Sequence, residues 1–322
     1  MSTGKTIDQT AHDCRAAFAQ QLLSLAREDS RIVAVCNDSV GSSQLTAFKA
    51  EFPDRLINVG IAEQTLVGVG AGLASAGLIP FVCAASPFLT GRSLEQVKVD
   101  VAYNQLPVIL CGMSPGMSYG ELGPTHHSVE DISWLRALPG LDVVLPGDRF
   151  QTAQAVTNAA QDPRPSFIRV ARRKVHDVSA DGDQLTRGVI DTARSGDDIT
   201  IIAAGTTMAN ALDAAELLAA QHGVQARVLN AAYIAPFDTE AVLTAARETK
   251  AILTVEDANV SGGLGAAVAS ALVSSPGTER VPVRMLGLRE FAPTGSESFL
   301  LEYFGLDPRS IAKTAYELLN LS

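Results

Sequence analysis

The sequence predicts an α/β protein built from two successive parallel-sheet domains, and three observations support this prediction. Short apolar runs rich in β-branched residues alternate with helical segments along the chain, which is typical of parallel sheets. The runs at residues 32–36 and 108–111 are apolar throughout, as strands buried on both faces require. The chain has 322 residues, of which 47% are hydrophobic, and this length is sufficient for two separate cores.

The first domain is expected to span residues 1–178. Its strands are predicted, in chain order, at residues 32–36, 55–59, 80–84, 107–111, 142–145 and 167–170. A helix is predicted at residues 65–77, where glycine and alanine are so frequent that the backbone can closely approach another helix or a flat ligand. Glycine lowers helix propensity, so packing must stabilise this helix.

A polar stretch from Val178 to Gly188 places the domain boundary near residue 180, because it is rich in residues that favour loops. We expect a linker at residues 179–195 and a second domain at residues 196–322. The strands of the second domain are predicted at residues 199–203, 226–229, 251–255 and 281–286. The chain contains no short-period repeat and no low-complexity tract.

Composition excludes several classes of function. The net charge is −10 and the only basic run is at residues 172–174, so nucleic acid and anionic membranes are not expected as general partners. The four cysteines form no C-x-x-C pair and are expected to be buried, reduced thiols. Residues 1–6 contain no apolar segment of signal-peptide length, and no apolar run reaches about 18 residues. We therefore expect a soluble cytoplasmic protein.

One carboxylate, Glu63, stands where the strand at residues 55–59 leads into the glycine-rich helix. Ligands of open parallel sheets bind at the carboxyl ends of the strands, so Glu63 is a candidate for chemistry. The alternative is a first-turn acid that only the helix dipole favours. Phe88 follows the strand at residues 80–84 and is expected at the same edge of the sheet.

A loop at residues 118–127 carries two adjacent histidines, His126 and His127, among turn-forming residues. A histidine above a strand-end crevice can transfer protons near neutral pH. The alternative is a pair of surface histidines without a function. Because Glu63, Phe88 and His126 are all expected at one sheet edge, we favour the functional interpretation.

Five short motifs occur in the order and spacing of one enzyme family. They are Asp-Cys-Arg at 13–15, Val-Gly-Ile-Ala-Glu-Gln at 59–64, Pro-Phe-Leu-Thr at 87–90, Leu-Gly-Pro-Thr-His-His at 122–127, and Val-Glu-Asp at 255–257 followed by Gly-Gly-Leu-Gly at 262–265. Together they resemble the carboxy-terminal half of transketolase-like thiamine diphosphate enzymes, over nearly the whole chain. The resemblance implies a pyrimidine-binding domain followed by the transketolase carboxy-terminal domain.

The resemblance also implies roles in cofactor binding. Glu63 would bond to N1′ of the aminopyrimidine of thiamine diphosphate and favour the imino tautomer, which removes the cofactor's C2 proton. Phe88 would stack on the same ring, a contact that contributes about 1 kcal/mol beyond burial. Ile61 and Asp38 would lie beside the cofactor.

Further roles implied by the resemblance concern the substrate. His126 would face the reacting carbon and either polarise the ketose carbonyl or move a hydroxyl proton, and His127 would lie nearby. Substrate phosphate would be held by Arg15, Ser42 and Arg172, since a guanidinium binds an oxyanion through two hydrogen bonds. The alternatives are a solvated first-turn residue for Arg15 and a domain-junction salt bridge for Arg172.

Two features of the sequence differ from full-length transketolases. Leu122 stands where those enzymes usually carry an aspartate that contacts a donor hydroxyl, which puts the donor's stereochemistry in question. The chain also lacks a Gly-Asp-Gly segment followed some thirty residues later by Asn-Asn, which would bind the diphosphate and its metal. Another polypeptide is therefore expected to bind the diphosphate and the Mg²⁺ or Ca²⁺.

The sequence thus predicts the carboxy-terminal subunit of a split transketolase, which transfers a two-carbon ketol unit from a ketose phosphate to an aldose. It would be active only with an amino-terminal partner subunit, in an α2β2 assembly. The nearest alternative is the β subunit of a 2-oxoacid dehydrogenase E1 component, which carries a different histidine loop. A deoxyxylulose-phosphate synthase is a further alternative, although that enzyme normally contains both halves in a single chain. A non-catalytic assembly module is the alternative of another class.

Overall fold

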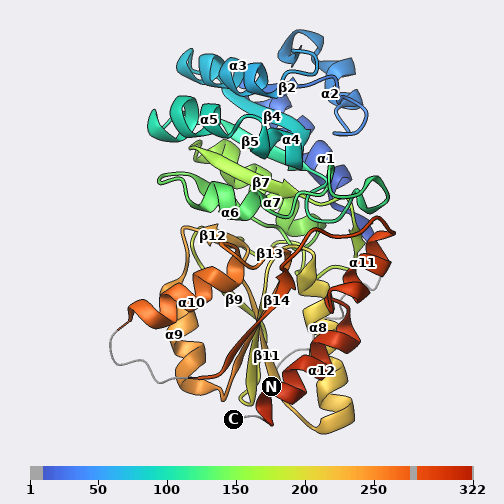
Figure 1. Ribbon diagram of the computed structural model, residues 1–322. Helices are drawn as coiled ribbons and strands as arrows, with labels where there is room; N and C mark the ends of the chain where they lie inside the picture. Colours follow the sequence, from blue (N-terminus) through green and yellow to red (C-terminus); the bar gives the residue numbers. More distant parts are fainter. Residues whose placement is uncertain (1–9, 276–280, 321–322) are drawn as a thin grey trace.

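The computed structural model describes residues 10–275 and 281–320. Each half of the molecule contains a mostly parallel sheet with helices on both faces (Figure 1). The predicted α/β class is therefore confirmed. Residues 1–6, where the sequence shows no targeting segment, lie outside the described residues.

The first sheet has the strand order β12-β6-β7-β5-β4-β2-β3. Its parallel strands all overlap predicted ones. They are β2 (Ile32–Cys36), β3 (Leu56–Asn58), β4 (Ile79–Ala85), β5 (Ile109–Met113), β6 (Asp142–Val144) and β7 (Ser166–Val170).

Helices cover both faces of this sheet. One face packs against α1 (Cys14–Glu28), α2 (Thr46–Glu51) and α7 (Arg149–Gln161), and the other against α3 (Glu63–Ser75), the helical segments α5 (Leu94–Gln96) and Val97–Tyr103, and α6 (Asp131–Arg136). Side chains of β4 alternate between the two cores, with Phe81 and Cys83 on the α1 side and Val82 and Ala84 on the α3 side. The apolar runs in the sequence reflect this burial on both faces.

The second sheet has the order β14-β13-β10-β11-β9. Its parallel strands are β10 (Ile199–Ala203), β11 (Ala226–Asn230), β13 (Ile252–Asn259) and β14 (Val283–Leu288), and β9 (Asp191–Arg194) is an antiparallel edge strand. Helices α8 (Thr207–His222) and α12 (Pro308–Leu319) cover one face, and α9 (Thr239–Glu248) and α10 (Leu264–Ser274) the other (Figure 1). The short helix α11 (Glu297–Tyr303) precedes α12.

The two halves share a strand and a core. Strand β12 (Tyr233–Ala235) follows β11 in the chain but pairs antiparallel with β6, at the edge of the first sheet. One hydrophobic core includes Phe167 of the first half together with Ile202 and Leu264 of the second. The linker proposed at residues 179–195 contains the whole of β9. The chain therefore crosses between the halves more than once.

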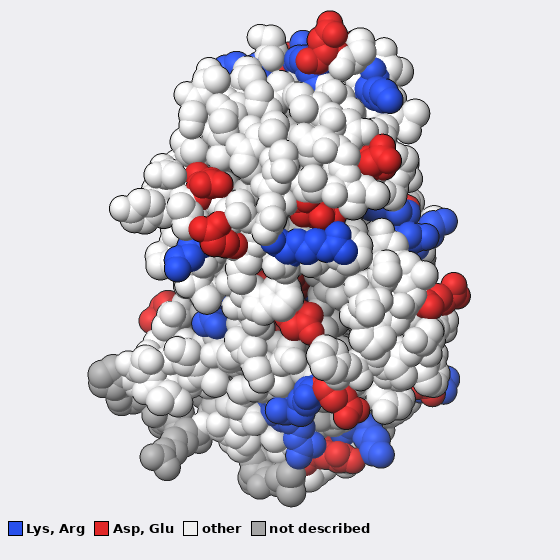
Figure 2. Space-filling view, turned by 45° about the horizontal axis from the view of Figure 1, so that its top comes forward, with Lys and Arg blue, Asp and Glu red and all other residues white. Residues whose placement is uncertain are grey.

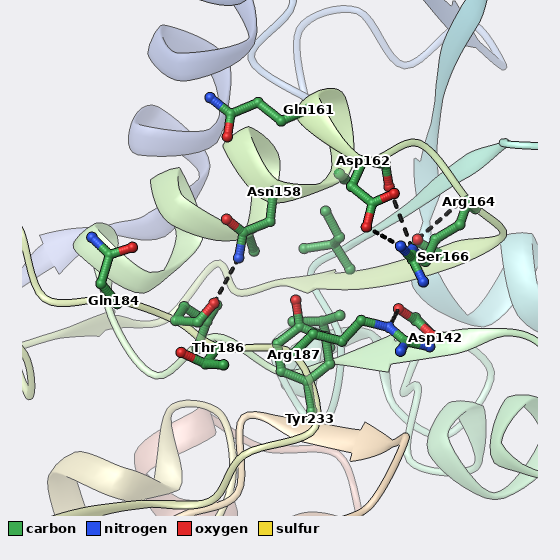
Figure 3. A pocket seen from close by; sticks show the side chains of 15 residues that line it. Asp142, Asn158, Gln161, Asp162, Arg164, Ser166, Gln184, Thr186, Arg187 and Tyr233 are labelled. Atoms are coloured by element: carbon green, nitrogen blue, oxygen red, sulfur yellow. Dashed lines mark hydrogen bonds and ion pairs between the residues drawn. The ribbon is translucent and has the colours of Figure 1, made fainter.

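A cavity of about 300 Å³ lies where this linker passes the first sheet (Figure 3). Arg187 donates to both carboxylate oxygens of Asp142, at 2.6 and 2.7 Å. Asn158 of α7 donates to the backbone carbonyl of Leu185 at 2.7 Å. Tyr233 of β12 also lines the cavity. These contacts attach the linker and β12 to the first domain.

On the face shown in Figure 2, lysine and arginine side chains are interspersed with aspartate and glutamate. Within residues 10–275 and 281–320, no helix is both long and apolar enough to cross a membrane. The four cysteines, Cys14, Cys36, Cys83 and Cys111, are buried and unpaired, as the sequence predicts.

Candidate active site

Parallel strands of the first sheet end at one edge, where the predicted site residues follow them. Asp38 lies just beyond β2, and Glu63 lies beyond β3 as the first residue of α3. Phe88 lies in α4 (Ser86–Gly91), directly after β4. The loop with His126 follows β5, and Arg172 follows β7. Because these strands are adjacent and parallel, the sheet gathers residues that are far apart in the sequence.

Glu63 is a buried carboxylate with only 4% of its surface exposed. The side-chain amide of Asn37 donates to Oε1 of Glu63 at 2.9 Å. Nη1 of Arg92 lies 3.1 Å from both carboxylate oxygens. A buried charge requires such partners, and the amino terminus of α3 adds favourable helix dipoles. The geometry therefore holds one oriented carboxylate at the sheet edge.

An aromatic group contacts Arg92, the partner of Glu63. The ring centroid of Phe88 is 4.0 Å from Cζ of Arg92 and 5.3 Å from the ring centroid of His126, which meets Phe88 edge-on. Glu63, Arg92, Phe88 and His126 thus form one continuous chain of contacts. The three residues that the sequence predicts for chemistry are brought to the same site.

The histidine loop is closed by two backbone hydrogen bonds between Gly116 and Ser128, at 2.9 and 2.8 Å. Oγ1 of Thr125 lies 2.9 Å from Nδ1 of His126, and the ring centroid of Tyr119 lies 6.2 Å from that of His126. These contacts orient the half-buried imidazole. His127 is buried, and burial lowers the pKa of its imidazole.

A buried polar network lies beneath Phe88 and the histidine loop. Asp131 accepts a hydrogen bond from Ser86 at 2.9 Å, and Ser128 donates to Ser86 at 2.9 Å. Arg169 donates to Asp131 at 3.0 Å and to the carbonyls of Ser128 and Asp257 at 2.9 Å. The network joins the start of α4, the end of the histidine loop and the second domain. Sequence reasoning missed it, although a charged residue inside the apolar strand β7 was a signal for it.

Asp38 and Ile61, the other two residues expected to bind the cofactor, make no hydrogen bond to Glu63 among the described contacts. The backbone N–H of Asp38 donates to Asn58 at 2.9 Å, and the Asn58 amide donates back to its carboxylate at 3.0 Å. The polar side chain against Glu63 is instead Asn37, which the sequence analysis did not select. Ile61 is 77% exposed two residues before α3, where it is open to a ligand or another chain.

The three residues expected to bind phosphate each have a different neighbour. Arg15 bonds to Asp13 through Nε at 3.2 Å and Nη2 at 2.7 Å, and Ser42 donates to the Ser39 carbonyl at 3.2 Å. Arg172 lies over the ring of Tyr119, with Cζ 5.4 Å from the centroid. It lines a cavity of about 420 Å³. Of the three, only Arg172 contacts the aromatic neighbour of His126.

Two family descriptions match the chain. "Transketolase, pyrimidine binding domain" matches residues 10–177, and "Transketolase, C-terminal domain" matches residues 188–311. Together they cover both of the sheets described above. The pair of domains that the motifs implied is confirmed.

Relatives of similar length carry transketolase names. The chain is 45% identical to a subunit of the apulose-4-phosphate transketolase of Phocaeicola vulgatus, over 95% of this chain and 97% of the relative. It is 40% identical to a subunit of the 6-deoxy-6-sulfo-D-fructose transketolase of a Clostridium species, over 95% of this chain and 94% of the relative.

A solved structure described as "Split gene transketolase, inactive beta4 tetramer" matches the fold with a TM-score of 0.86 and 34% identity. The match covers 98% of this chain and 99% of that one. The similarity therefore extends over the whole of both chains. The chain belongs to the transketolase family and contains its pyrimidine-binding and carboxy-terminal domains.

Proposed function

We propose that this chain is the carboxy-terminal subunit of a split, thiamine diphosphate-dependent transketolase that acts with an amino-terminal subunit. The observation that carries the proposal is the position of Glu63, which is buried, oriented by Asn37 and connected to Phe88 through Arg92. The loop that carries His126 lies against the same aromatic ring. An acid, a flat aromatic surface and a histidine are the groups that ketol transfer requires.

The residues fit the aminopyrimidine half of the cofactor. Arg92 contacts both Glu63 and Phe88 with a guanidinium, which is planar and carries N–H donors at its edge. The space between carboxylate and ring therefore accepts a flat hydrogen-bond donor. When bound, thiamine diphosphate supplies the electron sink that carries the two-carbon unit.

Each protein group has a distinct task in the proposed mechanism. Glu63 would bind the aminopyrimidine through its carboxylate and would favour the tautomer that the reaction needs by holding a proton at N1′. Phe88 fixes the plane of the pyrimidine ring. His126 polarises the donor carbonyl or moves a hydroxyl proton, and the contact with Thr125 keeps its imidazole oriented.

The diphosphate and its metal require another chain. Among the described residues, no three His, Cys, Asp or Glu side chains are grouped so that they could hold a metal ion. We therefore assign Mg²⁺ or Ca²⁺ and the diphosphate to the amino-terminal subunit, in an α2β2 heterotetramer. Two relatives are named as subunits, and the related beta4 tetramer is described as inactive, which supports this requirement.

We assign an anionic ketose as the donor. The names of the two relatives specify a phosphorylated and a sulfonated sugar. Arg172, together with Arg15 and Ser42, is proposed to bind the anionic group. Leu122 is 55% exposed at the position where an acid would contact a donor hydroxyl, so we expect the donor to lack that contact. The buried, unpaired cysteines support a cytoplasmic location.

The test is reconstitution of this chain with its amino-terminal subunit, thiamine diphosphate and Mg²⁺, followed by measurement of the aldose phosphate released from a ketose phosphate. Release should require both chains and should disappear with Glu63→Ala. Glu240→Gln, in the first turn of α9, is the control and should retain full activity. A complete two-chain complex that converts a 2-oxoacid but no ketose would favour the dehydrogenase alternative. A complex inactive on both would favour the non-catalytic module.

A further inference from the structure

Arg92 occupies the space between the two residues assigned to the aminopyrimidine. Its Nη1 lies 3.1 Å from each oxygen of Glu63, and its Cζ lies 4.0 Å from the ring centroid of Phe88. The guanidinium therefore hydrogen-bonds the carboxylate through its edge and covers the aromatic ring with its face.

These two contacts are the ones that an aminopyrimidine would make. Both groups are planar and delocalised, both carry N–H donors at the edge, and both stack on an aromatic face. Because Arg92 already hydrogen-bonds Glu63 and stacks on Phe88, the guanidinium and the ligand compete for the same binding site.

We propose that Arg92 is an internal stand-in for the aminopyrimidine. Its guanidinium occupies the site in the cofactor-free chain and moves out when the cofactor binds. The inference rests on the proposed function. It assigns Arg92 a role in cofactor loading, in which the guanidinium compensates the buried charge of Glu63 until the ligand replaces it. Without a partner, a carboxylate that is 4% exposed would be destabilising.

The side chain of Arg92 is placed so that it can leave. It is 51% exposed, whereas the Glu63 side chain is 4% exposed. Arg92 lies at the end of α4, where its backbone N–H donates to the Phe88 carbonyl at 3.1 Å. The backbone is therefore fixed while the long side chain can turn into solvent. Only chains in which Arg92 has moved out can bind the ligand. The apparent affinity is therefore lower than the intrinsic affinity, in proportion to the fraction of such chains.

The chain contains a natural reporter of this movement. Trp134 is the single tryptophan. A methyl group on Gly91, the residue before Arg92, would lie 3.2 Å from Cζ3 of Trp134. A change at Arg92 is therefore expected to alter the fluorescence of Trp134.

The test is a titration of the isolated chain with the pyrimidine half of the cofactor, 4-amino-5-hydroxymethyl-2-methylpyrimidine, followed by Trp134 fluorescence and by calorimetry. Arg92→Met keeps the length of the side chain and removes the competing donors, so it should lower the dissociation constant at least fivefold. Adding Glu63→Gln to Arg92→Met should abolish the gain. An affinity equal to or weaker than that of the wild type would overturn the proposal.

Chemical rescue keeps the proposal testable if Arg92→Met is unstable. Millimolar methylguanidinium should raise the melting temperature of Arg92→Ala and weaken its binding of the pyrimidine, with no effect on the wild type. The absence of either effect would contradict a stand-in role.

Calorimetry of thiamine diphosphate with the wild-type two-chain complex separates this inference from the proposed function. If the complex binds the cofactor but Arg92→Met brings no gain, only the stand-in role fails. If the complex does not bind the cofactor, both fail.

Discussion

Nε of Arg169 donates to Oδ2 of Asp131 at 3.0 Å, in a place where the two side chains are 6% and 0% exposed. Asp131 begins α6, and Arg169 lies in β7. The same Asp131 oxygen accepts a hydrogen bond from Ser86, which begins the helix that carries Phe88. This ion pair therefore holds the aromatic part of the site to the sheet.

Asp131→Asn should lower the free energy of unfolding by about 3–5 kcal/mol, because it leaves the buried guanidinium without its counter-charge. Urea denaturation measures the loss. The control is Glu51→Gln, which breaks an ion pair with Arg27 whose side chains are 38% and 56% exposed, and should change stability by less than about 1 kcal/mol. Equal losses in the two variants would show that the Arg169–Asp131 pair does not support the site.

Phe88→Leu should weaken the binding of thiamine diphosphate to the two-chain complex about fivefold, since it removes a stacking contact of about 1 kcal/mol. Calorimetry measures the dissociation constant. Phe150→Leu is a matched control, because Arg149 lies 4.5 Å from that ring in the same way as Arg92 does at Phe88. The prediction is wrong if both substitutions leave the affinity unchanged.

The stability of the chain should depend on pH through Asp257. Burial raises the pKa of this carboxyl from about 3.8 to about 7. Between these values the unfolded chain loses the proton while the folded chain keeps it, so the free energy of unfolding falls as pH rises, by up to about 1.4 kcal/mol per pH unit. Above pH 7 the contribution levels off.

Asp257→Asn should remove the part of this dependence that comes from Asp257 and leave the part that comes from its neighbour Glu256, whose pKa burial also raises to about 7. Urea denaturation at intervals between pH 4.5 and 7.5 should therefore show that the variant gains stability relative to the wild type as pH rises. Parallel stability curves for the two proteins would contradict the assignment.

Ile234→Ala should destabilise the first domain although the residue is encoded within the second. Ile234 is 1% exposed in β12, which pairs with β6 of the first sheet. Truncation of a buried isoleucine costs about 2–5 kcal/mol. Fluorescence of Trp134 in α6 reports on unfolding of the first domain, and its urea midpoint should fall. Val273→Ala, at a side chain 87% exposed, is the control. An unchanged Trp134 midpoint in Ile234→Ala would contradict a contribution of Ile234 to the stability of the first domain.

The fold was predictable because strands that are buried on both faces appear in the sequence as continuous runs of apolar residues. The missed strands are β1 (His12–Asp13), β8 (Lys174–Val175), β9 and β12, which are two to four residues long. Strands this short have no periodicity that a sequence reveals. The pairing of β12 with β6 depends on how the chain returns to the first sheet, which local sequence does not encode.

The motifs pointed to Glu63, Phe88 and His126, and the sheet brings these residues together. Asn37 and Arg92 were missed for different reasons. Asn37 precedes Asp38 at a strand end, where the backbone of Asp38 adopts φ of 67°, and the sequence does not show which of the two side chains faces Glu63. Arg92 lies four residues beyond Phe88, and its contact with Glu63 depends on where α3 and α4 meet in space.

If Glu63 activates the cofactor, it sets the rate at which solvent deuterium replaces the C2 proton of thiamine diphosphate bound to the two-chain complex. Quenched samples analysed by proton NMR give this rate. We expect fast exchange in the wild type, a rate at least 100-fold lower in Glu63→Gln, and an unchanged rate in Glu240→Gln. Equal exchange rates in wild type and Glu63→Gln would contradict this role of Glu63.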